Sequence, residues 1–296
     1  MKEFILHIVK LIILSILIIT LIDLVKTNYI INFDLRKKTN NFKQISDKNF
    51  DIVVFGNSRV NFNIDTRCAQ DSFNLKVYNF GIPGSNLPDI YQAINYFYEF
   101  GGKSKLILIQ LDNDFPEKNG NIISSQELVI NARGNFDNRY LKSIDSYPEV
   151  YLPHYIYSFN RDLSWREDLK RLFYNGRKNE YLGFRPLYDT IAKPIEMHFS
   201  SLKDSNPWIN EIESLIEEKN SRLAFFTSPV FYSNMEEARS YYKRLSELCH
   251  PYINQSELLE DCTNCFKDGN HVSYIGARKQ TVDLISQLKK RGLLVH

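Results

Sequence analysis

One short segment constrains the fold of this chain more than any other. Residues 52–55 are four consecutive apolar residues, which is typical of a short buried strand. They run directly into Gly56-Asn57-Ser58-Arg59, and Gly56 permits the sharp turn that would lift Ser58 out at the carboxyl end of the strand. A serine held on such a turn is placed to act as a nucleophile.

The following segments repeat the order strand, loop, helix, strand. Residues 76–80 predict a second strand, residues 89–100 an amphipathic helix, and residues 105–111 a third strand that is nearly all apolar. Later residues predict helices over 210–219, over 235–249 and from about 273, and a strand over 222–228. This order predicts an α/β domain on a mainly parallel central sheet, with a site at the carboxyl ends of the strands.

The first 25 residues predict a membrane segment. Residues 4–25 are almost entirely apolar, and about 20 such residues span a bilayer core of roughly 30 Å. We expect an uncleaved anchor over residues 1–25. A cleaved signal peptide and a buried core helix are the alternatives, although no small-x-small cleavage site follows Asp23. Positive charge flanks the segment on both sides, so it does not give the orientation.

Composition divides the rest of the chain. Residues 26–49 are rich in Lys, Asn, Asp and Thr, which indicates a juxtamembrane linker before a folded domain over residues 50–296. Residues 117–205 are rich in aromatic residues without a clean period, and we expect a helical insertion or cap over the sheet. Their aromatic rings could stack on sugars, but packing against the core is the simpler interpretation for any one of them.

Charge and cysteine content bear on whether the chain binds nucleic acid, forms disulfides or holds a metal ion. The formal net charge is +2 and no basic run is interleaved with aromatics, so we expect no nucleic-acid partner. The four cysteines are too few for a disulfide scaffold; the alternatives are a disulfide of Cys249 with Cys262 or Cys265, or unpaired thiols. The pair Cys262-x-x-Cys265 is at most half of a zinc site, so we expect no metal.

A base for Ser58 is found near the other end of the chain. A serine hydroxyl needs a neighbouring base, and that base needs a group that fixes its tautomer. His271 is the best candidate, because Asp268 three residues earlier could reach its far ring nitrogen, and Ser273 could cap the helix that follows. The alternative is a helix-entry loop that carries an ordinary surface histidine.

Together these motifs resemble those of the SGNH (GDSL-like) hydrolase superfamily. Gly56-Asn57-Ser58 matches the first block of that family, and Asp268 with His271 matches the last. Gly81, or alternatively Gly84, matches the second block, and residues 111–114 match the third only in part. Two residues depart from the pattern: Asn57 replaces the usual acid, and Leu111 replaces a glycine.

The resemblance implies a three-layer α/β/α fold and a role for each site residue. Ser58 would attack an ester carbonyl, His271 would take and return the proton, and Asp268 would orient His271. Backbone N–H groups of Ser58 or Arg59 and of Gly81 would form the oxyanion hole, with the Asn113 side chain as a further donor. The side chain of Arg59 could bind an anionic group of the substrate or form an internal salt bridge. No cofactor is implied.

With the N-terminal anchor, the chain is similar to a membrane-attached SGNH subgroup. That subgroup resembles the D-alanyl transfer protein of teichoic acid synthesis and the alginate and cell-wall O-acetylation proteins. It implies a single-pass protein with an extracytoplasmic domain that O-acylates a surface polysaccharide, most simply by O-acetylation, beside a membrane-bound O-acyltransferase. The alternatives are an esterase or deacetylase of the same family that hydrolyses glycan or small acyl esters, and a non-catalytic assembly or glycan-binding protein.

Overall fold

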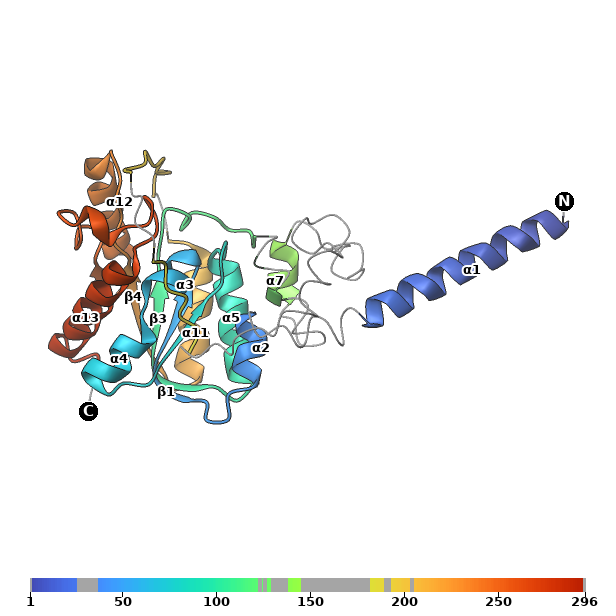
Figure 1. Ribbon diagram of the computed structural model, residues 1–296, viewed down its shortest axis with the longest axis horizontal. Helices are drawn as coiled ribbons and strands as arrows, with labels where there is room; N and C mark the ends of the chain where they lie inside the picture. The colour runs from blue at the N-terminus through green and yellow to red at the C-terminus, as the bar shows by residue number, and fades with distance from the viewer. Residues whose placement is uncertain are drawn as a thin grey trace.

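The computed structural model describes residues 2–25, 37–121, 124, 127–128, 138–144, 182–188, 193–202 and 205–294. Its centre is a five-stranded sheet in the order β2-β1-β3-β4-β5, and all neighbouring strands are parallel (Figure 1). The strands are β1 (Asn49–Gly56), β2 (Val77–Gly81), β3 (Lys103–Gln110), β4 (Arg222–Thr227) and β5 (Tyr252–Asn254). The predicted α/β class with a parallel sheet is confirmed.

Helices cover both faces of the sheet, because alternate residues of each strand point to opposite sides. Val53 and Phe55 of β1 pack with α2 (Lys38–Lys43), α5 (Leu87–Glu99), α11 (Pro207–Glu218) and α12 (Met235–Leu248). Ile52 and Val54 pack on the other face, with α3 (Ser58–Asn63), α4 (Thr66–Phe73) and α13 (Tyr274–Lys290). The result is the three-layer arrangement that the resemblance implied.

The strand order places a topological switch point at the carboxyl ends of β1 and β3. The chain moves from β1 outward to β2, crosses back past β1 to β3, and then continues to β4 and β5, so the direction of winding reverses between β1 and β3. Phe55 is in register with Ile109, so both strands end at the same level. The residues that follow them, Asn57 and Asp112, are hydrogen-bonded at 3.2 Å.

The predicted elements correspond to observed ones within a few residues, with local signals at their ends. Asn86 and Asp89 form a capping box at the start of α5, and Ser273 caps α13 as expected. Strand β5 was not predicted, because three residues are too few to show a period. The described part of the chain also includes helix α7 (Asn138–Ser143) and the short 3-10 helix η3 (Thr263–Cys265).

The linker expected over residues 26–49 includes residues that belong to the folded part of the chain. Residues 26–36 lie outside the described residues, but α2 belongs to the folded body. Phe42 is fully buried, and its ring lies 5.4 Å from that of Tyr78 and 5.2 Å from that of Phe97. The folded part therefore begins by Lys38 rather than at Phe50. The sequence does not predict this helix as part of the core, because Phe42 is the one apolar residue among its six.

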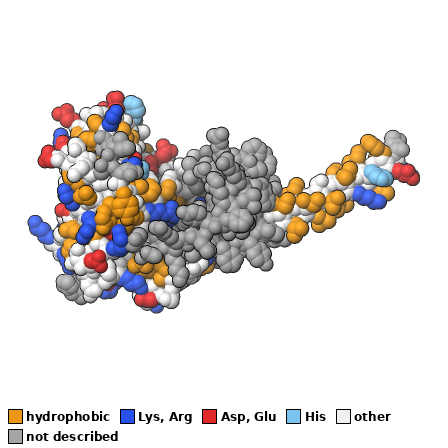
Figure 2. All heavy atoms as spheres, viewed as in Figure 1, with side chains coloured by type: hydrophobic (Ala, Val, Ile, Leu, Met, Phe, Trp, Pro, Cys, Tyr) orange, Lys and Arg blue, Asp and Glu red, His pale blue; other side chains and the backbone are white. Residues whose placement is uncertain are grey.

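The N-terminal helix α1 (Lys2–Val25) presents its apolar side chains outward (Figure 2). Residues 2–22 have a mean hydropathy of 2.8 and none of this stretch is buried, which contradicts the alternative of a buried core helix. Within the described residues this is the one helix long and apolar enough to cross a membrane. Length and composition fit a signal sequence equally well, so they establish a candidate span and no topology.

The cysteine pairing differs from the expectation. Cys262 and Cys265 are joined to each other, whereas Cys249 is a free, buried thiol. Burial raises the pKa of that thiol to about 12. The alternative of a disulfide between Cys249 and Cys262 or Cys265 is therefore wrong, and the alternative of unpaired thiols holds for Cys249 but not for Cys262 and Cys265. The half-zinc interpretation fails because both of its sulfur atoms are in the disulfide.

Much of the aromatic-rich segment 117–205 lies outside the described residues, including 145–181, so its expected cap-like fold stays a prediction. Two of its described aromatic residues, Phe184 and Tyr188, differ in their surroundings. Phe184 is buried in a small cluster with Leu259 and Phe266, which is ordinary packing. Tyr188 is 68% exposed and lies against Tyr274, with ring centroids 5.6 Å apart.

Candidate active site

Three of the predicted residues lie together at the carboxyl edge of the sheet. The Nε2 atom of His271 is 2.9 Å from the Oγ atom of Ser58. On the other side of the ring, Nδ1 is 3.0 Å from both carboxylate oxygens of Asp268. This is the order of contacts that activates a serine hydroxyl: nucleophile, base and orienting acid.

The turn that carries Ser58 is fixed by its neighbours in the sequence. Asn57 is the N-cap of α3, and its Oδ1 accepts a hydrogen bond from the Arg59 backbone N–H at 2.9 Å. Gly56 is required for a steric reason, since a Cβ atom there would lie 2.5 Å from Val60 and 2.9 Å from Gln110. Strand β1 therefore passes close under α3, and Ser58 becomes the first residue of that helix.

The loop that carries His271 is organised around one carboxylate oxygen. Asp268 Oδ1 accepts hydrogen bonds from the backbone N–H groups of Asn270 at 2.8 Å and of His271 at 2.9 Å. Partial burial raises the pKa of Asp268, but the hydrogen bonds from the His271 ring and these backbone groups outweigh it and lower the pKa to about 2. Asp268 is therefore ionised at any pH where the protein is expected to act.

Arg59 is an internal residue and not a binding residue. It is 2% exposed; one guanidinium nitrogen pairs with Asp112 and the other donates to the carbonyl of Ser228 at 2.5 Å. The possible substrate-binding role was wrong for this reason. The internal salt bridge, which was the alternative, fixes the end of β3 beneath the nucleophile turn.

The expected oxyanion donors have different surroundings. The N–H of Gly81 donates to Asn79 Oδ1 at 3.1 Å and the N–H of Arg59 is taken by Asn57, so neither is available as expected. The Ser58 N–H and the partly exposed Asn113 side chain have no hydrogen-bond partner among the described residues. The alternative glycine, Gly84, has a φ of 80° in the loop after β2, a conformation that favours glycine.

Sequence reasoning missed the polar cluster behind the site. Asp112 accepts from Asn57, from Arg59 and from Gln110 Nε2, the last at 3.0 Å. Asp114 lies 3.5 Å from the Asn57 amide; burial, and then the charge of Asp112, raise the pKa of Asp114 above its usual range. The available signal was position, because both carboxylates follow a buried strand at the edge where a site was expected.

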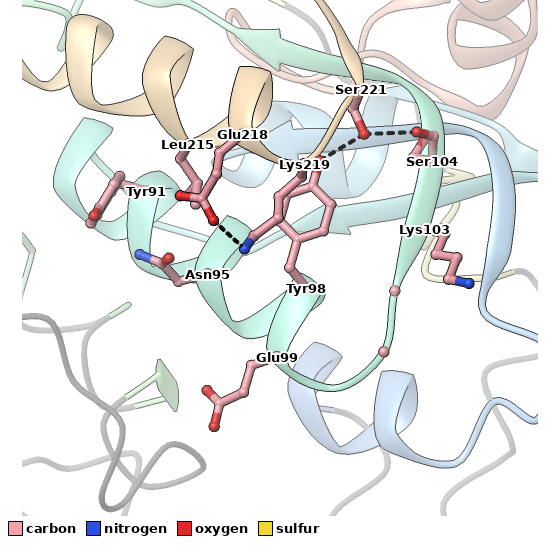
Figure 3. Close-up of a pocket in the computed structure, with 12 residues that line it drawn as sticks. Tyr91, Asn95, Tyr98, Glu99, Lys103, Ser104, Leu215, Glu218, Lys219 and Ser221 are labelled. Atoms are coloured by element: carbon pink, nitrogen blue, oxygen red, sulfur yellow. Dashed lines mark hydrogen bonds and ion pairs between the residues drawn. The ribbon is translucent and has the colours of Figure 1, made fainter.

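One hollow in the described part of the chain lies away from Ser58. A cavity of about 790 Å³ opens between the end of α5, the start of β3 and the end of α11 (Figure 3). Tyr98 donates to Ser221 at 2.9 Å in its wall, and Ser221 donates to the carbonyl of Ser104 at 2.8 Å. This hollow is at the amino ends of the strands, so it does not belong to the Ser58 site. Among the described residues, no group of three His, Cys, Asp or Glu side chains could hold a metal ion.

Comparisons with known proteins add little. No family model matches the chain, and no curated protein matches it either. One solved structure, described as that of "a putative platelet activating factor from Streptococcus pneumonia", is 14% identical, with 92% of this chain and 98% of that chain covered and a TM-score of 0.44. A likeness at this level indicates no activity, so function must be inferred from the geometry of the chain itself.

Proposed function

We propose that this chain is a serine-dependent acyl-transfer enzyme that works through an acyl-Ser58 intermediate. The observation that carries the proposal is the contact series from Ser58 Oγ to His271 Nε2 and from His271 Nδ1 to Asp268. An ordinary surface histidine in a helix-entry loop would not be expected to contact a serine 213 residues away in the sequence through one ring nitrogen and a carboxylate through the other. The geometry therefore favours an enzyme over the non-catalytic alternative.

The proposed reaction has two balanced halves. In the first, His271 Nε2 takes the proton of Ser58, the Ser58 oxygen bonds to the ester carbonyl carbon, and the leaving oxygen departs with the proton from His271. In the second, His271 Nε2 takes the proton of an acceptor hydroxyl whose oxygen bonds to the acyl carbon; the bond between that carbon and Ser58 Oγ then breaks, and His271 returns the proton to Ser58. Asp268 stabilises the imidazolium that forms in each half, and its low pKa keeps it ionised for that role.

The developing oxyanion needs donors that the site keeps free. The Ser58 N–H is the donor we assign first, with the Asn113 amide and the N–H of Gly84 as further candidates. One such donor is commonly worth about 3 to 4 kcal/mol of transition-state stabilisation. Gly81 is not included, because its N–H is occupied by Asn79.

For the acceptor, we propose a hydroxyl of a cell-surface polysaccharide. Two features support this: the resemblance to membrane-attached SGNH proteins of polysaccharide O-acylation, and the apolar helix α1, which could hold the domain at a membrane. By the same resemblance, a membrane-bound O-acyltransferase would supply the acyl group. Hydrolysis differs only in that water replaces the sugar hydroxyl, so the triad alone favours neither outcome.

The test is a competition between acceptors. Full-length protein in detergent is given p-nitrophenyl acetate with and without an oligosaccharide, and acetylated sugar and free acetate are both quantified by mass spectrometry. Acetyl-sugar that depends on Ser58 supports transfer. Acetate alone, unchanged by any oligosaccharide in a panel of surface glycans, would favour the esterase alternative.

A further inference from the structure

Tyr232 contacts the His271 loop from a part of the chain that the proposed mechanism does not use. It is 3% exposed, and its hydroxyl donates to Asn270 Oδ1 at 2.8 Å. The backbone N–H of the same Asn270 donates to Asp268 Oδ1, also at 2.8 Å. One intervening residue therefore connects a buried tyrosine to the carboxylate that orients His271.

The same tyrosine faces the buried charges under Ser58. The side chains of Arg59, Asp112, Asp114 and Tyr242 lie close enough to Tyr232 to act on its hydroxyl electrostatically. Tyr242 in turn lies 3.4 Å from Asp112 Oδ1. Tyr232 thus lies between the polar cluster that fixes the serine turn and the loop that carries the histidine.

A second contact from the neighbouring residue holds the same loop. The backbone N–H of Phe231 donates to the carbonyl of Gly269 at 3.0 Å. The Phe231 contact holds the backbone of the loop at Gly269. The Tyr232 hydroxyl holds the side chain of the next residue, Asn270, which directly precedes His271. The Asp268 side chain itself is 52% exposed.

We propose that Tyr232 is a positioning residue, whose hydroxyl holds Asn270 so that Asp268 and His271 stay aligned with Ser58. The inference rests on the proposed function for its catalytic consequence, but the positioning itself is a property of the loop. It assigns Tyr232 no contact with substrate or with the reacting atoms. The chain of contacts predicts that loss of one hydroxyl loosens the loop without disturbing the fold around it.

The substitution that tests this is Tyr232→Phe, which removes the hydroxyl and retains the ring. Tyr241→Phe is the matched control, because Tyr241 is a buried neighbour whose hydroxyl donates to the Asp112 carbonyl at 3.1 Å. Its ring lies against those of Phe199 and Tyr242, and within the described part of the chain it makes no hydrogen bond to the loop. Both variants lose one buried hydrogen bond, so a general loss of stability would affect them alike. Hydrogen exchange is measured by mass spectrometry on full-length protein in detergent, together with the rate of Ser58 modification by p-nitrophenyl acetate.

The expected result is local. Peptides covering residues 266–272 should exchange about tenfold faster in Tyr232→Phe than in wild type or Tyr241→Phe, with peptides from β1 and β3 unchanged. Ser58 acylation should slow by a similar factor, through kcat with KM retained. Unchanged exchange in the loop, or faster exchange throughout the domain, overturns the inference. Local loosening in a protein whose Ser58 never reacts would support the positioning role and refute the proposed function.

Discussion

His271 Nε2 lies 2.9 Å from Ser58 Oγ, although the two residues are 213 positions apart. Ser58 begins α3, and His271 lies in the loop before α13, which packs on the same face of the sheet as α3. The contact therefore depends on how this loop is held against α3. Changes that move the loop should affect the chemistry before they affect the fold.

Gly269 provides one such change. A Cβ atom at this position would lie 2.3 Å from Ile195 Cγ1, and Gly269 is not in a left-handed conformation, so only the neighbouring side chain opposes an alanine. We expect Gly269→Ala to displace the loop and to lower Ser58 reactivity about tenfold or more. Stopped-flow acylation with p-nitrophenyl acetate measures this.

The double variant Gly269→Ala/Ile195→Ala gives the control. Shortening Ile195 to alanine removes the two nearest atoms, Cγ1 and Cδ1, and leaves only Cβ, 3.0 Å from the new methyl group, so reactivity should recover most of its loss. If the double variant reacts more slowly than Gly269→Ala alone, the steric explanation is wrong and Ile195 supports the loop in another way.

Arg59 distinguishes an internal ion pair from a binding residue. Arg59→Met leaves Asp112 buried without its partner, which typically costs about 3 to 5 kcal/mol of unfolding free energy. Arg239 pairs with Glu257 on the surface, so Arg239→Met should change stability little. Urea unfolding compares the two variants. A stable Arg59→Met protein with only a raised KM would restore the substrate-binding interpretation.

Asp89 should make stability depend on pH. Burial raises its pKa to about 6, although the backbone N–H groups of Asn121 and Asn86 and the hydroxyls of Ser124 and Tyr140 act in the opposite direction. Because the folded pKa exceeds the ordinary value of about 3.9, this group contributes stability below about pH 4. That contribution, on the order of 3 kcal/mol, is lost as pH rises through about 6.

Asp89→Asn removes the titration and keeps an oxygen for the two backbone N–H groups. The stability of this variant relative to wild type should therefore improve between pH 4 and pH 7, as measured by urea unfolding at several pH values. A constant difference between the two proteins across this range would mean that Asp89 is ionised throughout.

The sequence could predict the parts of the fold that depend on local patterns. Residues 52–56 and 105–111 predicted β1 and β3 because apolar runs of that length have few alternatives, and Ser273 predicted the start of α13 because its hydroxyl can cap a helix. His271 and Asp268 were predicted as partners of Ser58 from their spacing of three residues and from the resemblance of the motifs, since the loop that carries them does not directly follow a strand. Helix α2 was not predicted as part of the folded domain, because Phe42 is its one apolar residue and the others are polar.

What the sequence could not predict depends on contacts across the fold. Arg59 pairs with Asp112 because the fold buries both side chains at the carboxyl edge of the sheet. No local sequence pattern shows that the two residues come together there. The N–H of Gly81 is occupied because the side-chain oxygen of Asn79, two residues earlier in β2, accepts its hydrogen bond. Tyr232 carries no motif at all, and its contact with Asn270 appears only once the loops are placed.

The most direct test of the central claim is covalent trapping of Ser58. Full-length protein in detergent is incubated with a fluorophosphonate, and the modified residue is located by mass spectrometry in wild type, Ser58→Ala and His271→Ala. We expect an adduct on Ser58 in wild type, none in Ser58→Ala, and labelling slowed at least 100-fold in His271→Ala, because the serine then lacks its base. Labelling of another residue, or labelling of Ser58 that does not depend on His271, would contradict the account.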